Sequence, residues 1–368
     1  MRCKHFGECG SCRNYELSYD EQLEGKVARI QKMFSPFYSG NIDVFESPQE
    51  HYRARSEFKI WHVEDEIHYA MNALYHKGVV LIEECPMVSE SIASLMPNLL
   101  LKIKECGIDR KLFGADFLST QKGELLVTLI YHRKLDDEWK HKAQEIAKEL
   151  GIKIIGRSRK QKIVLSDDFV VETLNINEKK YEFKQIENSF TQPNAKVNEK
   201  MLGWAMKQFD GLDADLLELY CGAGNFTIPF ASKFTKVLAT EISKSSINAA
   251  KTNMQLNGVD NIEFVRMGVE EFTQALDGVR AFRRMKDIDI ASYTLESIFV
   301  DPPRSGMDEN TCKFTSRFDN ILYISCNPET LLVDLERLKE HHKVVSMALF
   351  DQFPYTNHLE MGVKLQKL

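Results

Sequence analysis

The sequence has no long apolar run and no apolar stretch behind its first residues. Its 368 residues are 43% hydrophobic and 28% charged, with only 10 prolines and 19 glycines. A membrane-spanning helix needs about 20 mostly apolar residues in succession, and a secretory signal needs an apolar core after a basic start. The first ten residues, M-R-C-K-H-F-G-E-C-G, offer neither. We therefore expect a cytoplasmic chain of two or three globular domains, with no membrane partner and no long disordered tail.

The chain also lacks an excess of positive charge. Lys and Arg number 48 against 54 Asp and Glu, so the formal net charge is −6. Proteins that bind nucleic acids usually present a basic surface, and the overall charge argues against that class. RNA binding is compatible with this charge only if basic residues cluster on one face. Two candidate clusters for phosphate contact are Arg53, Arg55 and Lys59 on a predicted strand, and Arg157, Arg159, Lys160 and Lys162 between short predicted strands.

A glycine-containing turn follows one predicted strand but lacks the features of a phosphate-binding loop. The segment L-L-E-L-Y-C-G-A-G-N, Leu216 to Asn225, is a strand that runs into a turn with two glycines. It has neither the third glycine of a dinucleotide fingerprint nor the Lys-Ser/Thr pair of a P-loop. The next predicted strand ends at Glu241, in the position of the acidic residue that binds ribose hydroxyls in nucleotide folds. An adenosyl ligand without phosphates, S-adenosylmethionine, fits this pattern.

Cysteines are few, eight in all, and four of them can form a set. Cys3, Cys9 and Cys12 have the spacing C-x5-C-x2-C, and Cys85 is available as a fourth member. In a cytosolic protein such spacing favours metal or cluster ligation over disulfides. Zinc sites usually consist of two close pairs, whereas this set is three plus a distant one. Four thiolates suit an iron–sulfur cluster, and zinc or free thiols are the alternatives.

Two predicted strands end in polar residues followed by proline. They are S-I-F-V-D-P-P-R-S-G, from Ser297, and I-L-Y-I-S-C-N-P-E-T, from Ile321. Asp301 and Cys326 should then lie at the carboxyl ends of successive parallel strands, which is the edge where open α/β sheets bind ligands. Cys326 also precedes a predicted helix N-terminus, whose dipole and free N–H groups favour a thiolate. The alternative interpretation of Cys326 is a small buried core residue.

The alternation of predicted elements divides the chain into two parts. Strands alternate with helices from Leu216 to the end, which predicts a doubly wound parallel sheet whose final strand is antiparallel. From about residue 54 to 185 the pattern is mixed α+β and carries no catalytic motif. We therefore predict an N-terminal domain over residues 1–185, with the Cys segment, an amphipathic helix and an α+β module, and a second domain over residues 186–368.

Six motifs follow one another along the chain. They are F-T-Q-P-N (Phe190–Asn194), E-L-Y-C-G-A-G-N-F (Glu218–Phe226), A-T-E-I (Ala239–Ile242), F-V-D-P-P-R-S-G (Phe299–Gly306), Y-I-S-C-N-P-E-T (Tyr323–Thr330) and H-L-E (His358–Glu360). In this order and spacing they resemble the RNA uracil-5-methyltransferase family. Segments outside these motifs resemble its tRNA branch most closely, so the resemblance covers nearly the whole chain.

The resemblance implies a fold, a cofactor and a substrate. The fold is a doubly wound, Rossmann-like class I methyltransferase sheet with an N-terminal mixed α+β RNA-binding domain. The methyl donor is S-adenosylmethionine, and the substrate is the T-arm of tRNA, where the T-loop uridine becomes 5-methyluridine (ribothymidine); tmRNA is a further expected substrate. The implied cofactor contacts are Gln192, Tyr220, Asn225, Glu241 and Asp301. We expect a monomer.

The resemblance also assigns two catalytic residues. Cys326 is the nucleophile that adds to C6 of uracil, which makes C5 reactive enough to accept a methyl group. Glu360 is the general base that removes the remaining C5 proton before the thiolate leaves. The target base cannot react while it is stacked, so it must flip into the site. The set Cys3, Cys9, Cys12 and Cys85 is similar to the [4Fe–4S] ligands of ribosomal RNA members of the family.

Three other functions compete with this interpretation. A ribosomal RNA uracil-5-methyltransferase would use the same chemistry, and the four-cysteine set favours it. A non-catalytic RNA-binding or folding factor would have no need for Cys326, Asp301 and Glu360 together. An RNA cytosine-5-methyltransferase would place a second cysteine after the D-x-P strand, where this chain has Arg304.

Overall fold

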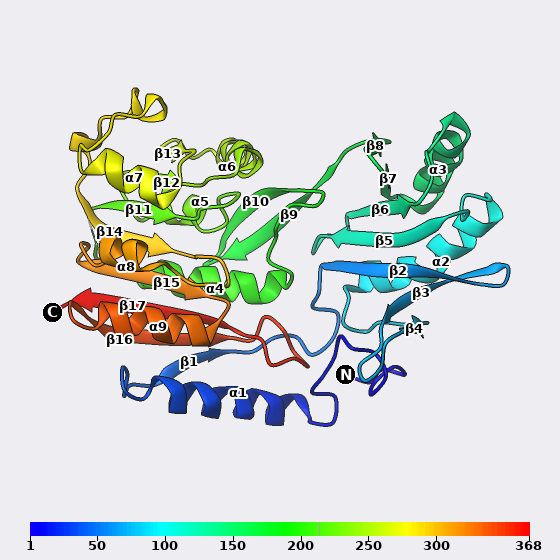
Figure 1. Ribbon diagram of the computed structural model, residues 1–368, viewed down its shortest axis with the longest axis horizontal. Coiled ribbons are helices and arrows are strands. Elements are labelled where there is room, and N and C mark those ends of the chain that lie inside the picture. Colours follow the sequence, from blue (N-terminus) through cyan, green and yellow to red (C-terminus); the bar gives the residue numbers. More distant parts are fainter. Residues whose placement is uncertain (213) are drawn as a thin grey trace.

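Figure 1 shows the computed structural model, which describes residues 1–212 and 214–368. The α-helices are α1 (Tyr19–Phe34), α2 (Glu90–Glu105), α3 (Asp137–Leu150), α4 (Ala195–Lys207), α5 (Thr227–Phe230), α6 (Lys244–Leu256), α7 (Val269–Leu276), α8 (Glu309–Thr315) and α9 (Pro328–Leu338). The strands are β1 (Ile42–Phe45), β2 (Arg55–Val63), β3 (Glu66–Asn72), β4 (Val79–Ile82), β5 (Leu112–Ser119), β6 (Leu125–Tyr131), β7 (Lys153–Ser158), β8 (Gln161–Val164), β9 (Phe169–Ile176), β10 (Lys179–Ile186), β11 (Asp215–Leu219), β12 (Val237–Thr240), β13 (Ile262–Val265), β14 (Leu295–Val300), β15 (Asn320–Ser325), β16 (His342–Phe350) and β17 (Glu360–Lys367). None of the helices in this part of the chain combines the length and apolar character needed to cross a bilayer.

The larger sheet has eight strands in the described residues, in the order β1-β16-β17-β15-β14-β11-β12-β13. Strands β15, β14, β11, β12 and β13 run parallel, and β17 is inserted antiparallel between β15 and β16. One apolar layer packs α4, α5 and α6 on one face, and a second packs α1, α7, α8 and α9 on the other. The predicted doubly wound sheet with a final antiparallel strand is therefore confirmed.

The first helix and strand of the chain belong to this larger sheet. Helix α1 begins with a capping box, in which Ser18 and Glu21 satisfy each other's backbone N–H groups. It packs beside α9, and β1 pairs in parallel with β16, with Ile42 opposite Met347 (Figure 1). The predicted domain boundary between residues 185 and 186 stays a prediction. Strand pairing places β1, and packing beside α9 places α1, with the second half of the chain.

A second sheet has the order β4-β3-β2-β5-β6-β7-β8 and carries α2 and α3 on one face. Helix α3 begins at Asp136, which caps the N–H of Trp139, and ends at Gly151 in the left-handed conformation with φ +64°. A separate hairpin, β9–β10, packs on α4 and α6 and lies between the two sheets in Figure 1.

Candidate functional site

A cavity of about 1080 Å³ lies at the carboxyl edge of the larger sheet, bordered by β10 and the segment that follows it. The cavity is lined by all seven residues that the sequence predicted as catalytic or cofactor-binding: Gln192, Tyr220, Asn225, Glu241, Asp301, Cys326 and Glu360. The structure thus brings together side chains that lie up to 168 positions apart in the sequence. Their individual roles remain predictions.

Three strand ends place the residues proposed for the chemistry. Asp301 follows β14, and Cys326 follows the neighbouring parallel strand β15. Glu360 is the first residue of β17, and Ser325 of β15 pairs with Met361 of β17. Continuing this antiparallel register by one position sets Glu360 opposite Cys326. The antiparallel insertion of β17 is therefore what brings a carboxylate from the last strand to Cys326.

The turn around Cys326 has the predicted form. Asn327 caps helix α9, because its side chain accepts a hydrogen bond from the N–H of Glu329 at 3.2 Å. Pro328 occupies the first turn of the helix, where the missing N–H has no intrahelical partner to lose. The side-chain amide of Asn327 also donates to the carbonyl oxygen of Arg304 at 3.1 Å, which ties this turn to the turn after β14.

The expectation that the helix terminus favours a Cys326 thiolate is wrong for the ligand-free protein. Burial and, to a lesser extent, the nearby carboxyl groups of Glu360 and Asp301 together raise the pKa of the Cys326 thiol to about 11. The Arg304 guanidinium opposes this effect without overcoming it. Desolvation and like charge outweigh the helix terminus here because the thiol sits inside a carboxyl-lined cavity.

Burial also raises the pKa of three carboxyl groups in the cavity. It brings the pKa of Asp301 to about 7 and that of Glu218 to about 8, with a further contribution to Glu218 from Asp301. The pKa of Glu360 lies well above its ordinary value, because of burial and then because of Asp301. Sequence reasoning missed Glu218. The signal was present, since Glu218 is a carboxylate in the middle of the apolar strand L-L-E-L.

The glycine-containing turn after β11 is held against Glu241. Gly222 and Gly224 have φ angles of +55° and +84°, a backbone conformation that residues with a side chain rarely adopt. The Glu241 carboxylate accepts hydrogen bonds from the N–H of Gly222 at 3.2 Å and from the N–H of Ser243 at 2.7 Å. This arrangement leaves the backbone of the turn close to the cavity with no side chain in the way, as an adenosyl ligand requires.

The amide side chains among the predicted cofactor residues are paired with other amides. Asn225 and Asn198 exchange two hydrogen bonds, at 2.9 and 3.0 Å. Gln192 accepts one from Gln352 at 3.3 Å. The Gln352 Oε1 atom is buried without a hydrogen-bond partner in the described residues. These pairs fix the orientation of the amides that face the cavity.

Helix α1 holds the segment that leads into Glu360. The Lys26 ammonium donates to Asp351 Oδ1 at 2.6 Å and to the carbonyl oxygen of Phe353 at 3.1 Å, and both side chains of the ion pair are at most 5% exposed. The N–H of Tyr355 donates to Gln22 Oε1 at 2.8 Å. The N-terminal helix is therefore part of the support of the cavity.

The buried ion pair leads to a stability prediction. In a Lys26→Met variant, the Asp351 carboxylate stays buried without its cation, and we expect the free energy of unfolding to fall by about 3–5 kcal/mol. Denaturant unfolding measures the change. Lys32→Met is the matched control, because Lys32 is exposed on the same helix, and it should shift stability by no more than about 0.5 kcal/mol. Equal stabilities of the two variants would refute this assignment.

The two predicted basic clusters differ in the structure. Arg53 and Arg55 line the cavity, and the Arg53 Nε atom donates to the carbonyl oxygen of Arg55 at 2.8 Å. In the second cluster, Arg157 makes two hydrogen bonds to Glu187, at 2.6 and 2.7 Å. Lys162 pairs with Asp168 at 2.9 Å and with Glu187 at 3.3 Å. Half of the second cluster is thus neutralised within the protein.

An exposed aromatic pair lies on the smaller sheet. The ring of Phe113 stacks on His132 with a centroid distance of 3.6 Å and an interplanar angle of 15°. Phe113, the second residue of β5, is 37% exposed, although most of the strand is buried. A flat pair of exposed rings of this kind can stack on an unpaired base.

The four N-terminal cysteines gather in one region without forming a metal site. Burial and the neighbouring thiols of Cys85, Cys9 and Cys3 raise the pKa of Cys12 to about 12. In residues 1–212 and 214–368, however, no three His, Cys, Asp or Glu side chains are arranged to hold a metal ion. The predicted iron–sulfur cluster therefore has no support in this geometry.

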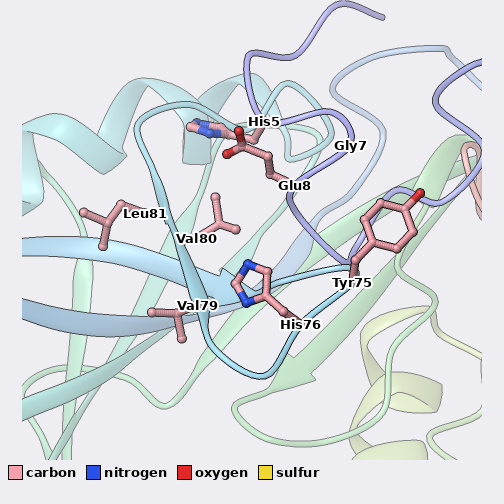
Figure 2. Close-up of a pocket in the computed structure, with 8 residues that line it drawn as sticks. All are labelled: His5, Gly7, Glu8, Tyr75, His76, Val79, Val80 and Leu81. Atoms are coloured by element: carbon pink, nitrogen blue, oxygen red, sulfur yellow. The ribbon is translucent and has the colours of Figure 1, made fainter.

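A second pocket, of about 560 Å³, lies beside this cysteine region and contains none of the predicted site residues. Figure 2 shows its side chains, with His5 and Glu8 on one side and His76 and Tyr75 on the other. The Nε2 atom of His5 already accepts a hydrogen bond from the N–H of Glu83 at 3.1 Å. The larger cavity is therefore the candidate site.

Comparisons with known proteins agree with this geometry. A family model described as tRNA (Uracil-5-)-methyltransferase matches residues 18–368. A protein of Sulfurimonas denitrificans named tRNA/tmRNA (uracil-C(5))-methyltransferase is 64% identical over 368 residues, all of both chains, and a Sulfurovum protein of the same name is 52% identical over 370 residues, also all of both chains. The crystal structure of Pyrococcus abyssi tRNA (uracil-54, C5)-methyltransferase in complex with S-adenosyl-L-homocysteine matches with a TM-score of 0.71 at 21% identity, over 96% of this chain and 84% of that one.

Proposed function

Because the chain belongs to the tRNA (uracil-5-)-methyltransferase family, we propose that it transfers the methyl group of S-adenosylmethionine to C5 of a uridine in tRNA. The observation that carries the proposal is the meeting of Cys326, Asp301 and Glu360 in one cavity at the carboxyl edge of the doubly wound sheet. We further propose the T-loop uridine as the target and the cytoplasm as the place of reaction. We also propose tmRNA as a second substrate, in line with the names of the relatives.

The cavity fits the methyl donor. Glu218 Oε2 is a buried polar atom of the lining without a partner among the described residues, and the Gly222–Gly224 turn leaves its backbone open. Glu241 suits the ribose hydroxyls, and Asp301 suits the methionine end with its positive charge. When bound, the donor supplies a methyl group on a positively charged sulfur.

The residues of the chain act on the uracil ring. The Cys326 thiol first loses its proton to solvent, the sulfur then adds to C6, and the electron pair of the C5–C6 double bond moves to make C5 nucleophilic. After C5 has gained the methyl group, it still carries its proton. Glu360 takes that proton, the C5–C6 double bond re-forms, and the C6–sulfur bond breaks to release the thiolate. The strand register that sets Glu360 opposite Cys326 supports this division of roles.

RNA contact is proposed for the rim of the cavity and for the smaller sheet. Arg53 and Arg55 at the lining suit phosphate oxygens, and the exposed pair Phe113 and His132 suits an unstacked base. A flipped uridine needs a pocket that receives the base and a side chain that fills the space left in the base stack. No step is assigned to the four cysteines, and we propose that the enzyme acts as a monomer.

The substrate can be tested directly. Incubation of the protein with labelled methyl donor and separate tRNA and ribosomal RNA transcripts should place label in tRNA, in the T-loop uridine. A tRNA transcript with cytidine at that position is the control and should stay unlabelled. Label found only in ribosomal RNA would establish the alternative substrate, and label in neither would favour a non-catalytic RNA-binding factor.

A further inference from the structure

Three carboxyl groups face the same cavity, two of them almost fully buried and the third, Asp301, partly exposed. Glu218, Asp301 and Glu360, here called the carboxyl set, lie on or next to β11, β14 and β17. Glu218 is 1% exposed and Glu360 is 4% exposed. The Glu218 Oε2 atom has no hydrogen-bond partner in the described residues although it borders the cavity. Buried carboxylates in proteins are normally paired with a cation or a metal, so such a set needs an explanation.

No cation of the chain compensates the carboxyl set. Burial raises the pKa of all three groups, Asp301 raises that of the other two, and no Lys, Arg or His in the described residues lowers any of them. The basic side chains that line the cavity contact other groups. Arg304 lies near Cys326 and contacts His358, and Arg53 and Arg55 donate hydrogen bonds to backbone carbonyl oxygens. The Lys184 ammonium lies over the ring of Phe169. The other titratable groups near the set add no positive charge: they are the Glu241 carboxylate and the side chains of Tyr220, Cys221, Tyr323 and Cys326.

We propose that the carboxyl set holds protons in the ligand-free protein and releases at least one of them when the cationic methyl donor binds, with Glu218 as a further donor-binding residue. This inference rests on the proposed function. The donor carries two positive groups, its sulfonium and its α-ammonium, against one carboxylate. An opposite charge within about 4–6 Å lowers the pKa of a carboxyl group by about 1–3. The bound donor thus provides the positive charge beside the carboxyl set that no side chain of the described residues provides.

The charge on the sulfur also determines when Glu360 can accept the C5 proton. While the sulfur is positively charged, the ionised form of Glu360 is favoured and can act as a base. Methyl transfer leaves a neutral thioether in the cavity, so the charge that favoured ionisation is gone. Glu360 then takes the C5 proton when its protonated form is most stable, the C5–H electron pair re-forms the C5–C6 double bond, and the thiolate leaves C6. The proton released on binding passes to the buffer.

The sign of the pH dependence follows from these groups. Their pKa values are raised in the free protein, to about 7 for Asp301 and about 8 for Glu218, so protons are bound at pH 7. A cation that binds to the ionised form must displace them. Affinity for the methyl donor therefore rises with pH through this window, by up to about tenfold per pH unit for each proton released. The demethylated product has the α-ammonium but no sulfonium, and its affinity should rise less.

The test compares the two ligands on the full-length protein. Calorimetric titration with S-adenosylmethionine and S-adenosylhomocysteine at pH 7, in buffers of different ionisation enthalpy, counts the protons released by each. We expect about half a proton or more of excess release for S-adenosylmethionine. We also expect the affinity ratio of the two ligands to change about tenfold in its favour from pH 6 to pH 8. Titration of the α-amino group largely cancels in this ratio. Equal proton counts for the two ligands would overturn the proposal.

Two variants localise the effect. Glu218→Gln is similar in shape and should cut the excess proton release at least by half. Glu241→Gln is the matched control, since Glu241 is partly exposed and bound to backbone N–H groups, and it should weaken both ligands alike with the excess unchanged. If both variants behave as wild type, Glu218 has no such role. RNA methylation is measured separately, so a protein that shows the proton excess but makes no 5-methyluridine contradicts only the proposed function.

Discussion

A Cys326→Ala protein is expected to make 5-methyluridine at least about 10⁴-fold more slowly than the wild type. Without the sulfur, nothing in the cavity adds to C6, and C5 of the resting uracil is too weak a nucleophile to take the methyl group. Loss of a covalent nucleophile commonly costs several orders of magnitude in turnover. Single-turnover assays with a T-arm transcript measure the rate, and binding of S-adenosylhomocysteine to the variant shows whether the cavity is intact.

A second cysteine provides the control for this experiment. Cys106 ends helix α2, far from the cavity lining, and its thiol is also partly accessible. Cys106→Ala should retain the wild-type rate. Wild-type turnover by the Cys326→Ala protein would remove covalent catalysis from the mechanism and leave the fold and the family unaffected.

Replacing Glu360 with glutamine should trap the RNA on the protein. The amide has the shape of the carboxyl group but cannot accept the C5 proton, so addition and methyl transfer proceed while release of Cys326 stops. General-base catalysis typically contributes about 10²–10⁴-fold, and turnover should fall by that amount. The trapped species is a protein–RNA conjugate that survives denaturing electrophoresis and contains the transferred methyl group.

The adduct is assigned to its sulfur by a double variant. Cys326→Ala combined with Glu360→Gln should give no conjugate at all. A conjugate that persists in the double variant would point to another nucleophile in the cavity, with Cys221 as the other lining thiol. Normal turnover of the single Glu360→Gln protein would show that a different group removes the proton.

The sequence predicted the site residues better than the energetics of the site. Motifs at strand ends are local, so Asp301, Cys326 and Glu241 could be placed at one edge as soon as the strands were assigned as parallel. The pKa of Cys326 could not be predicted in that way. It depends on Glu360, which reaches the thiol only through the antiparallel pairing of β17. The local helix terminus was visible in the sequence, and the carboxyl groups that outweigh it were not.

Long-range pairing also explains what was missed elsewhere. Strand β1 has only four residues, a weak signal in the sequence, and its partner β16 lies about 300 residues away. The basic cluster at Arg157 looked available for RNA, but its partner Glu187 comes from the end of β10. The sequence shows Glu218 as a carboxylate in an apolar strand, but only the structure shows that it lines the cavity.

The pairing of β1 with β16 has a consequence for biosynthesis. A ribosome adds about 5–20 residues each second, so the partner of Ile42 emerges roughly 15–60 s after Ile42 itself. During that interval the apolar face of α1 is not yet covered by the larger sheet. Strand β1 has no partner and can pair with other chains. The beginning of the nascent polypeptide therefore stays open to wrong pairing until the strand β16 has been translated.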